Sequence, residues 1–190
     1  MASTQSSTLP LGTPAPAFTL PDAHGVDRAL VDMMGARGTL VAFVCNHCPY
    51  VKHVARDLGT VARRWVDQGI GVVAINSNDA DQYPDDRPER MVEQAESWGW
   101  NFPYLVDADQ TAARAYRAAC TPDFFLFDSS GALVYRGRFD GSTPGNNVPL
   151  TGEELDAAVV ALVAGEPIST DQRSSVGCSI KWKPGNEPGW

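Results

Sequence analysis

The sequence predicts an α/β fold in which a central mixed β-sheet is flanked by helices. Apolar runs at 39–45 and 70–75 indicate buried strands, and segments with apolar residues at helical spacing separate the strands. Two further apolar runs, 123–128 and 133–139, are joined by a tight turn at 129–132, which predicts an antiparallel hairpin. Because strands linked through helices run parallel and hairpin strands run antiparallel, the sheet should contain both arrangements.

The segment before the first core strand is expected to be extended. Residues 1–13 are expected to form a flexible N-terminal segment. Pro14 and Pro16 keep their neighbours out of the helical region, so 14–20 should be extended. A turn at 22–25 should then lead toward strand 39–45.

Helices are predicted where apolar residues recur three or four positions apart. The longest, 49–67, carries an apolar face made of Val51, Val54, Leu58, Val61 and Trp65. Shorter helices are predicted at 89–98 and 111–118, on either side of a short strand at 104–106. Four aromatic residues in this region are expected in the core: Trp98, Trp100, Phe102 and Tyr104.

Two polar stretches interrupt this pattern. The loop 76–88 holds four aspartates, Asp79, Asp81, Asp85 and Asp86, but it lacks the glycine and terminal glutamate of an EF-hand. We therefore expect a solvated loop. The last helix is predicted to open with a capping box of Thr151 and Glu154 and to run to about Ala164. Residues 165–190 show no period.

Length and composition favour one domain, 1–190, with a core at about 14–164 and a C-terminal tail at 165–190. The formal charge is −8 and the pI is about 4.7, which argues against a nucleic-acid surface. No apolar run is long enough to span a bilayer. Residues 1–8 lack the basic and apolar regions of a signal peptide, so we expect a cytoplasmic location and no membrane partner.

Four cysteines occur: Cys45, Cys48, Cys120 and Cys178. In a reducing compartment, a close pair is more often catalytic or metal-binding than structural. Cys45 and Cys48 form a Cys-x-x-Cys pair between strand 39–45 and helix 49–67. Unpaired N–H groups and the helix dipole favour a thiolate at a helix N-terminus, and the thiolate is the reactive form of cysteine. The pair therefore predicts a redox dithiol.

The order of elements and the dithiol together resemble the thioredoxin superfamily from about Pro14 to Ala164, closest to its redoxin branch of TlpA/ResA-like proteins and peroxiredoxins. Residues 16–20 are similar to the N-terminal extension of that branch, and Thr121-Pro122 stands where the superfamily keeps a cis-proline facing the dithiol. More narrowly, three stretches are similar to proteins known only as thioredoxin-like or redoxin-domain: Cys-Asn-His-Cys-Pro-Tyr-Val-Lys-His, Cys-Thr-Pro-Asp-Phe-Phe, and the tail 177–188.

The resemblance implies a thioredoxin-like fold and a thiol–disulfide oxidoreductase without a cofactor. We expect Cys45, as the more exposed thiol, to attack a substrate disulfide and Cys48 to release the mixed disulfide. His47 precedes Cys48 as in DsbA-type sites, where a cationic imidazole favours the Cys45 thiolate. The Thr121 backbone, beside a cis Pro122, should pair with an extended substrate. The implied partners are a disulfide or thiol substrate and an unidentified reductant or oxidant; the oligomeric state stays open.

Departures from the family pattern leave two rivals. Thioredoxins usually carry Trp and a buried acid where this chain has Val44 and Thr39, and the peroxidatic Pro-x-x-x-Thr/Ser-x-x-Cys signature is missing. One rival is a peroxiredoxin-like peroxidase with Cys45 as the peroxidatic thiol. The other is a metal-binding protein without catalysis, whose ligands would be Cys45, His47 and Cys48 with Cys120 or Cys178.

The remaining two cysteines are open to two interpretations each. Cys120, close to Pro122, is either an accessory thiol near the dithiol or a small buried core residue. Cys178 lies in the aperiodic tail. We expect residues 174–183 to fold back across the active face, anchored by Ile180 and Trp182, and to bring Cys178 near Cys120 or Cys45. The alternative is a free thiol on a solvated tail.

Overall fold

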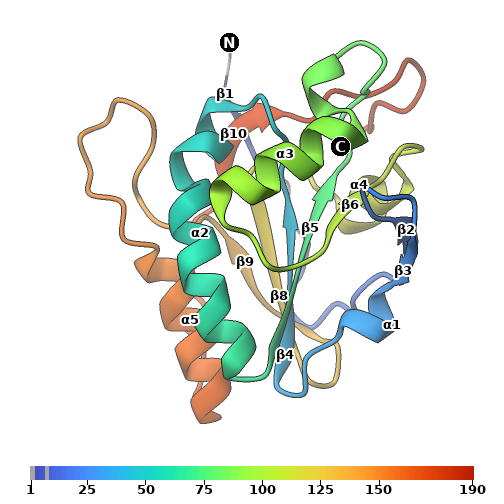
Figure 1. The fold of residues 1–190 in the computed structure, drawn as a ribbon. Helices are drawn as coiled ribbons and strands as arrows, with labels where there is room; N and C mark the ends of the chain where they lie inside the picture. Colours follow the sequence, from blue (N-terminus) through green and yellow to red (C-terminus); the bar gives the residue numbers. More distant parts are fainter. Residues whose placement is uncertain (1–2, 7–8) are drawn as a thin grey trace.

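The structure, a computed structural model, describes residues 3–6 and 9–190, and within them five strands form the central sheet (Figure 1). Its strand order is β6-β5-β4-β8-β9. The bounds are β4 (Gly38–Phe43), β5 (Ile70–Asn76), β6 (Tyr104–Val106), β8 (Asp123–Asp128) and β9 (Leu133–Gly137). Strands β4, β5 and β6 run parallel to one another, whereas β8 is antiparallel to both of its neighbours, β4 and β9. The predicted mixed sheet is thus confirmed.

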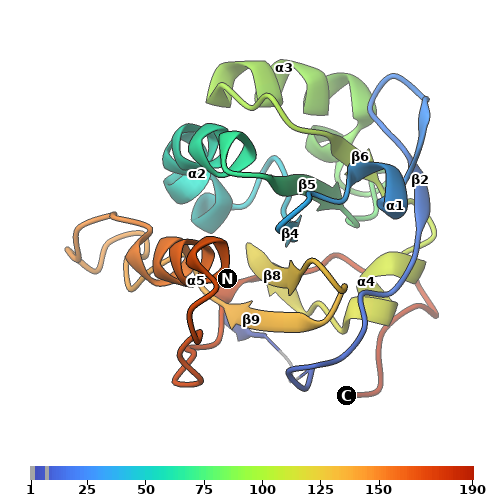
Figure 2. The same cartoon turned by 90° about the horizontal axis from the view of Figure 1, so that it is seen from below.

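Helices cover both faces of the sheet (Figures 1 and 2). The helices are α1 (Leu30–Met33), α2 (Pro49–Asp67), α3 (Pro88–Trp98), α4 (Thr111–Tyr116) and α5 (Glu153–Ala164), with a short 3₁₀ helix η1 (Pro84–Asp86). The first apolar cluster lies under α2, α3 and α5, and the second lies under α1 and α4. Alternate residues of one strand serve the two clusters, so Leu40 belongs to the first and Val41 to the second.

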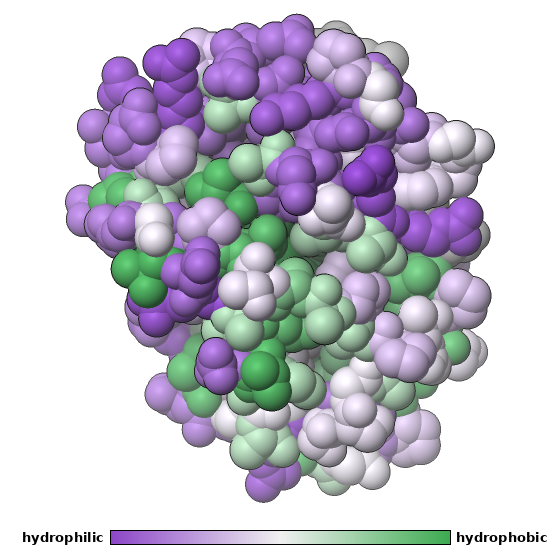
Figure 3. Space-filling model, turned by 90° about the vertical axis from the view of Figure 1, so that its right-hand side faces the viewer, coloured by the Kyte–Doolittle hydropathy of each residue, from purple (hydrophilic) through white to green (hydrophobic). Residues whose placement is uncertain are grey.

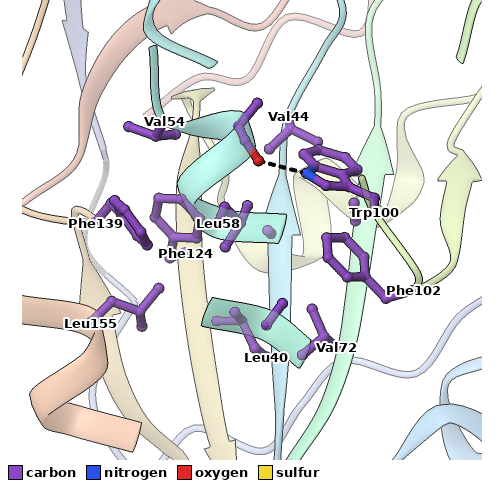
Figure 4. Close-up of a cluster of buried hydrophobic side chains, with 14 of the residues drawn as sticks. Leu40, Val44, Val54, Leu58, Val72, Trp100, Phe102, Phe124, Phe139 and Leu155 are labelled. Atoms are coloured by element: carbon purple, nitrogen blue, oxygen red, sulfur yellow. Dashed lines mark hydrogen bonds between the residues drawn. The ribbon is translucent and has the colours of Figure 1, made fainter. Parts of the chain in front are cut away.

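The first cluster fixes α2 against the sheet (Figure 4). Leu58 and Phe124 are buried between this helix and the sheet, and each buried side chain of this size stabilises the fold by roughly 1.5–3 kcal/mol. The indole N–H of Trp100 donates to the Ala55 carbonyl over 2.8 Å. These contacts hold α2 against the sheet, and the dithiol lies in the loop directly before the first turn of this helix.

Two small sheets complete the chain. β1 (Ser3–Gln5), β10 (Val176–Ser179) and β7 (Cys120–Thr121) form an antiparallel sheet with β10 in the middle. β2 (Thr19–Pro21) and β3 (Asp27–Ala29) form a second pair. The sequence analysis predicted a flexible N-terminal segment and an aperiodic tail where β1 and β10 lie. Short segments without an alternating pattern become strands here because their partners come from the opposite end of the chain.

The predicted capping box is wrong. Helix α5 begins at Glu153, after Gly152 in the left-handed region with φ 67°. Glu154 pairs with Arg138 at 2.6 Å instead of reaching back toward Thr151. The carboxylate of Asp140 accepts the amides of Thr151 and Gly152, both at 2.6 Å, so a residue from a distant loop orders the start of the helix.

One face of the molecule carries an apolar hollow lined by Phe18, Leu30, Val31 and Met34. Figure 3 shows apolar residues gathered over the centre of the side that bears α1, β2 and β3. This hollow is at the start of β5, since the Met33 carbonyl approaches Gly71, and the dithiol follows the opposite end of the sheet. Across the described residues, no helix has both the length and the hydrophobicity that crossing a membrane requires.

Candidate active site

The two thiols of the Cys-x-x-Cys pair lie between β4 and α2, and both are fully buried. Cys45 comes two residues after the end of β4. Cys48 immediately precedes Pro49, the first residue of α2, and is therefore the thiol at the helix N-terminus. The expectation that Cys45 is the more exposed thiol, at the helix start, is wrong, because the four-residue motif forms a loop before the helix begins. All four cysteines of the chain fall within the described residues and are free thiols.

Cys45 is surrounded by groups that favour its protonated form. Its Sγ lies 3.4 Å from the Thr121 hydroxyl. A hydrogen bond with Cys48, together with burial and the nearby carboxylate of Asp86, raises the pKa of Cys45 well above its usual range. Cys45 is thus a thiol that gives up its proton with difficulty.

Cys48 is surrounded by groups that favour the thiolate. A hydrogen bond from Cys45 lowers the pKa of Cys48 to about 5 against the opposing effect of burial, and Cys178, Thr121 and the Val51 amide in the first turn of α2 act in the same direction. In the protonated form, the Cys48 S–H donates to the Thr121 carbonyl over 3.2 Å. The hydrogen bond between the two thiols, the carboxylate beside Cys45 and the first turn of α2 beside Cys48 therefore favour the thiolate at Cys48, whereas the sequence analysis expected it at Cys45.

The carboxylate of Asp86 organises the Cys45 side of the site. Its Oδ1 accepts the Asn46 amide at 2.7 Å and the Asn76 side chain at 3.2 Å. Its Oδ2 accepts His47 Nδ1 at 2.6 Å and the Asn78 side chain at 2.8 Å. Burial opposes ionisation, yet the hydrogen bonds from His47, Asn78 and Asn46 outweigh burial and lower the pKa of Asp86 below its usual range.

The prediction of a solvated acidic loop is thus wrong at its centre. Asp85 is exposed, as expected, but Asp86 is buried at 2% and Asp79 at 3%. Asn46 is a second residue that the sequence analysis missed. It accepts the Tyr104 hydroxyl at 3.0 Å and donates to the Asp85 carbonyl at 2.8 Å. A Cys-x-x-Cys loop with a polar residue at its second position was the signal available for it.

His47 is directed at Asp86. Because a carboxylate only accepts, the Nδ1 atom of His47 carries the proton in this pair. The ring also stacks on Tyr83 with centroids 5.3 Å apart. The expected role of His47 as a neighbour that stabilises the Cys45 thiolate does not fit this arrangement, since its Nδ1–H faces the carboxylate of Asp86 instead.

Cys45, His47 and Asp86 each place one potential ligand atom within 4.8 Å of the others. Such a donor set suits zinc, although the bond between His47 and Asp86 would have to open. The set differs from the predicted one, because Asp86 stands where a second cysteine was expected.

The peptide bond between Thr121 and Pro122 is cis, as the resemblance implies. Thr121 lies between the two thiols, with its hydroxyl toward Cys45 and its carbonyl toward Cys48. However, the backbone edge that was expected to pair with a substrate is occupied. Cys178 is opposite Thr121, and Ser179 is opposite Cys120, in the antiparallel pairing of β10 with β7.

The tail folds back over the active face and brings Cys178 near Cys120, as predicted, but the thiol of Cys178 hydrogen-bonds to a third cysteine. Cys178 is buried and hydrogen-bonds to Cys48, which was not among the expected neighbours. Burial and this hydrogen bond raise the pKa of Cys178 to about 12. Of the two expected anchors, Ile180 is buried and Trp182 is half-buried against the second cluster.

Cys120 fits the core interpretation. It is fully buried, and its Sγ lies 3.8 Å from the Pro122 carbonyl. Burial and the carboxylate of Asp123 raise the pKa of Cys120 well above its usual range. Its thiol is therefore suited to packing rather than to exchange.

Comparison with known proteins places this geometry in a family. Residues 11–136 match the model of the AhpC/TSA family, a span that includes the dithiol and the cis-proline but ends before the tail. A thiol–disulfide oxidoreductase ResA from Geobacillus thermodenitrificans is 26% identical over 68% of this chain and 70% of its own length. A protein from Mycobacterium tuberculosis that carries the provisional name of a peroxiredoxin is 30% identical over 60% of this chain and 68% of its own length.

Two solved structures match nearly the whole chain. An uncharacterized conserved protein from Geobacillus kaustophilus is 49% identical, with a TM-score of 0.94, over 97% of this chain and 98% of that one. A hypothetical protein from Sinorhizobium meliloti is 47% identical, with the same TM-score, over 96% of this chain and 100% of that one. The fold itself is thioredoxin-like, as shown by a DsbE-type thiol:disulfide interchange protein from Chlorobium tepidum, which is 22% identical over 82% of this chain and 99% of that one, with a TM-score of 0.64.

Proposed function

The chain belongs to the AhpC/TSA family, and we propose that within it the protein is a thiol–disulfide oxidoreductase that works through Cys45 and Cys48. One observation carries this proposal: two buried thiols share Thr121, and their pKa values are shifted in opposite directions. Such a pair presents one thiolate for attack and keeps one protonated thiol beside it for release. The similarity to ResA proteins supports the same chemistry.

The exchange proceeds in two steps that balance. The Cys48 thiolate attacks one sulfur of a substrate disulfide, the substrate S–S bond breaks, and the departing thiolate takes a proton from solvent. The sulfur of Cys45 then attacks the Cys48 sulfur of the mixed disulfide. The second substrate thiol leaves with the proton of Cys45, and a Cys45–Cys48 disulfide remains. Two electrons pass from the dithiol to the substrate, and the reverse sequence oxidises a substrate dithiol.

The residues around the pair direct this order of events. Asp86 keeps Cys45 protonated until the mixed disulfide has formed, because a second negative charge beside the carboxylate is unfavourable. His47 holds Asp86 in place and is a positioning residue in this scheme. Thr121 contacts both sulfurs and keeps them in one geometry through the change of partners.

The identity of the substrate and of the recycling partner belongs to the proposal as well. A thiol or disulfide substrate follows from the exchange chemistry. The cytoplasmic location expected from the sequence stays a prediction, which fractionation of cells that produce the full chain would check. The single domain over 1–190 likewise stays a prediction.

Peroxide reduction is the second candidate, favoured by the low pKa of a buried cysteine and by the similarity to a protein named as a peroxiredoxin. Against it, the positions where a peroxidatic cysteine at Cys48 would need a hydroxyl residue and a proline hold Cys45 and Val41. The two candidates predict different rates with the two oxidants.

The test uses reduced protein and two oxidants in parallel, oxidised glutathione and hydrogen peroxide. We expect glutathione disulfide to produce the Cys45–Cys48 disulfide faster than peroxide at equal concentration, with two glutathione molecules released per protein. Cys48→Ser should abolish the reaction, and Cys45→Ser should slow release of the second glutathione. Cys120→Ala is the matched control and should react like the wild type. Faster oxidation by peroxide, with turnover, would contradict the proposal in favour of a peroxidase.

A further inference from the structure

Strand β10 is part of the active site. It is the middle strand between β1 and β7 and lies against the start of α2 (Figure 1). Cys178 is opposite Thr121 in the register of β10 and β7. Since the Thr121 carbonyl oxygen is only 3.2 Å from Cys48 Sγ, this register brings the tail cysteine to the reactive sulfur. The three cysteines Cys45, Cys48 and Cys178 belong to one buried cluster.

Gly177 shows how closely the strand is seated. A Cβ atom at this position would lie 2.0 Å from the Thr121 carbonyl oxygen, much nearer than any real side chain tolerates. Only glycine allows the β10 backbone to approach the cis-proline loop to this distance. Glycine next to Cys178 is therefore required for β10 to lie this close to the active site.

Hydrogen bonds hold the tail on both sides of Cys178. Before it, the Ser6 amide donates to the Ser175 carbonyl at 3.0 Å. After it, the Ile180 amide donates to the Ala119 carbonyl at 3.2 Å, and the Lys181 amide donates to the Asn78 side chain at 2.8 Å. Asn78 also binds Asp86, so the tail and the polar side of the dithiol share one network. These hydrogen bonds fix the position of Cys178 in the site.

We propose that Cys178 is a third catalytic thiol, which resolves the mixed disulfide at Cys48 and forms a Cys48–Cys178 disulfide. This inference rests on the proposed exchange function and adds a residue that lies outside the span matched by the family model. In the step, the Cys178 sulfur attacks the Cys48 sulfur, the bond between Cys48 and the substrate breaks, and the substrate thiol departs with the proton of Cys178. The substrate disulfide supplies the oxidising equivalents.

The Cys48–Cys178 disulfide can then be exchanged for a disulfide within the Cys-x-x-Cys motif. The Cys45 sulfur attacks Cys48, the bond to Cys178 breaks, and the proton of Cys45 moves to Cys178. Cys178 returns to the thiol form and a Cys45–Cys48 disulfide remains. The Cys48 sulfur is thus flanked by two possible resolving thiols, one from the motif and one from the tail, because Cys48 contacts both.

The test isolates the tail cysteine with 5,5′-dithiobis(2-nitrobenzoate), whose coloured thiol counts each step. In reduced Cys45→Ser protein, attack by Cys48 releases one equivalent, and resolution by Cys178 releases a second and leaves a Cys48–Cys178 bridge in peptide maps. In the Cys45→Ser/Cys178→Ser double variant, the first equivalent should still appear and the second should be slowed at least 100-fold. Cys45→Ser/Cys120→Ala is the matched control and should still release two equivalents.

A second pair of variants tests the seating of β10. In the Cys45→Ser background, Gly177→Ala should push the strand away and slow the second release at least tenfold. Gly189→Ala places a methyl group in open space on the same tail and should change nothing. If Gly177→Ala does not fold, the Cys178→Ser comparison alone decides.

The outcomes separate the two proposals. A first release without a second one from Cys45→Ser, with the reagent retained on Cys48, overturns the role of Cys178 and leaves the exchange function intact. A lack of any release from Cys48 in the wild type and all variants overturns the exchange function itself. A second release that persists in the Cys178→Ser double variant also overturns the inference.

Discussion

The two sides of the dithiol are equally buried and chemically opposite. Cys45 and Cys48 both have 0% exposure, so burial cannot distinguish them. Next to Cys45 is the carboxylate of Asp86, with four hydrogen-bond donors and a lowered pKa. On the Cys48 side are the start of α2, the Thr121 carbonyl and the tail strand. With burial equal, the hydrogen bond between the thiols and the charges and dipoles around them raise the pKa of Cys45 and lower the pKa of Cys48.

A second buried carboxylate, Asp123, differs from Asp86 in the direction of its pKa shift. Asp123 lies at the end of the cis-proline loop and accepts the Ser6 hydroxyl at 2.7 and 2.8 Å, with Arg136 at 3.8 Å. Burial raises the pKa of Asp123 to about 6, because these partners offset it only in part. Asp86 and Asp123 are thus two buried acids with opposite pKa shifts, and the folded state should respond to pH with opposite signs at the two places.

The largest effect should come from the Cys45 side. Asp86→Asn removes the charge that four donors are arranged to bind, so the free energy of unfolding should fall by roughly 2–4 kcal/mol. Because the pKa of Asp86 is lowered, its contribution is present above its usual pKa of 3.8 and is lost as the pH falls through the folded value, below 3.8. Urea unfolding at pH 7 and at lower pH measures both.

The matched control for this variant is Asp85→Asn, an exposed carboxylate one position away, which should change the stability by less than about 0.5 kcal/mol. Equal losses in the two variants would mean that Asp86 does not organise the site.

Asp123→Asn should show a pH dependence of the free energy of unfolding opposite to that of Asp86→Asn. An acid with a raised native pKa holds its proton more tightly when folded, so its contribution to stability is greatest below about pH 4 and declines as the pH rises to about 6. Across this window the wild type should lose up to roughly 3 kcal/mol relative to the variant, since one pKa unit corresponds to about 1.4 kcal/mol. Parallel stability curves of the two proteins between pH 4 and 7 would contradict the prediction.

The thiols themselves should differ in alkylation. With iodoacetamide at pH 6, Cys48 should be modified at least tenfold faster than Cys45, because the thiolate fraction outweighs the lower nucleophilicity of a low-pKa thiolate. Peptide mass analysis of reduced protein gives the ratio. Asp86→Asn should lower the pKa of Cys45 and so reduce the ratio of the Cys48 to the Cys45 alkylation rate. Faster labelling of Cys45 in the wild type would restore the order expected from the sequence.

The smallest effect should come from Tyr104→Phe, which removes the hydrogen bond that the Tyr104 hydroxyl donates to Asn46 at 3.0 Å. The free energy of unfolding should fall by about 1 kcal/mol, as for a single neutral hydrogen bond. Chemical denaturation measures it. A change as large as that of Asp86→Asn would show that Tyr104, and not the carboxylate, holds the Cys45 side together.

Local pattern by itself determined the scaffold of this protein. The period of apolar residues predicted α2 at 49–67 with its observed bounds, and the apolar runs placed the strands β4, β5 and β8 within one or two residues. The dithiol at a strand-to-helix junction and the tail that folds back were also predicted. These features follow from sequence because the spacing of apolar residues decides which face of an element is buried, whatever lies on the other side.

Only the tertiary structure decided the chemistry of the site. Asp86 reaches Asn46 from 40 positions away, and the tail pairs with β7 through Cys178 and Thr121, 57 positions apart. Asp86 raises the pKa of Cys45 and Cys178 lowers the pKa of Cys48, so the structure favours a thiolate at Cys48 where the sequence analysis expected one at Cys45. The tail likewise occupies the β7 edge that the sequence analysis expected a substrate to pair with. The physical reason is range: an ionisation equilibrium is set by charges and donors within a few ångströms, and in a folded chain those atoms come from segments that local patterns do not connect.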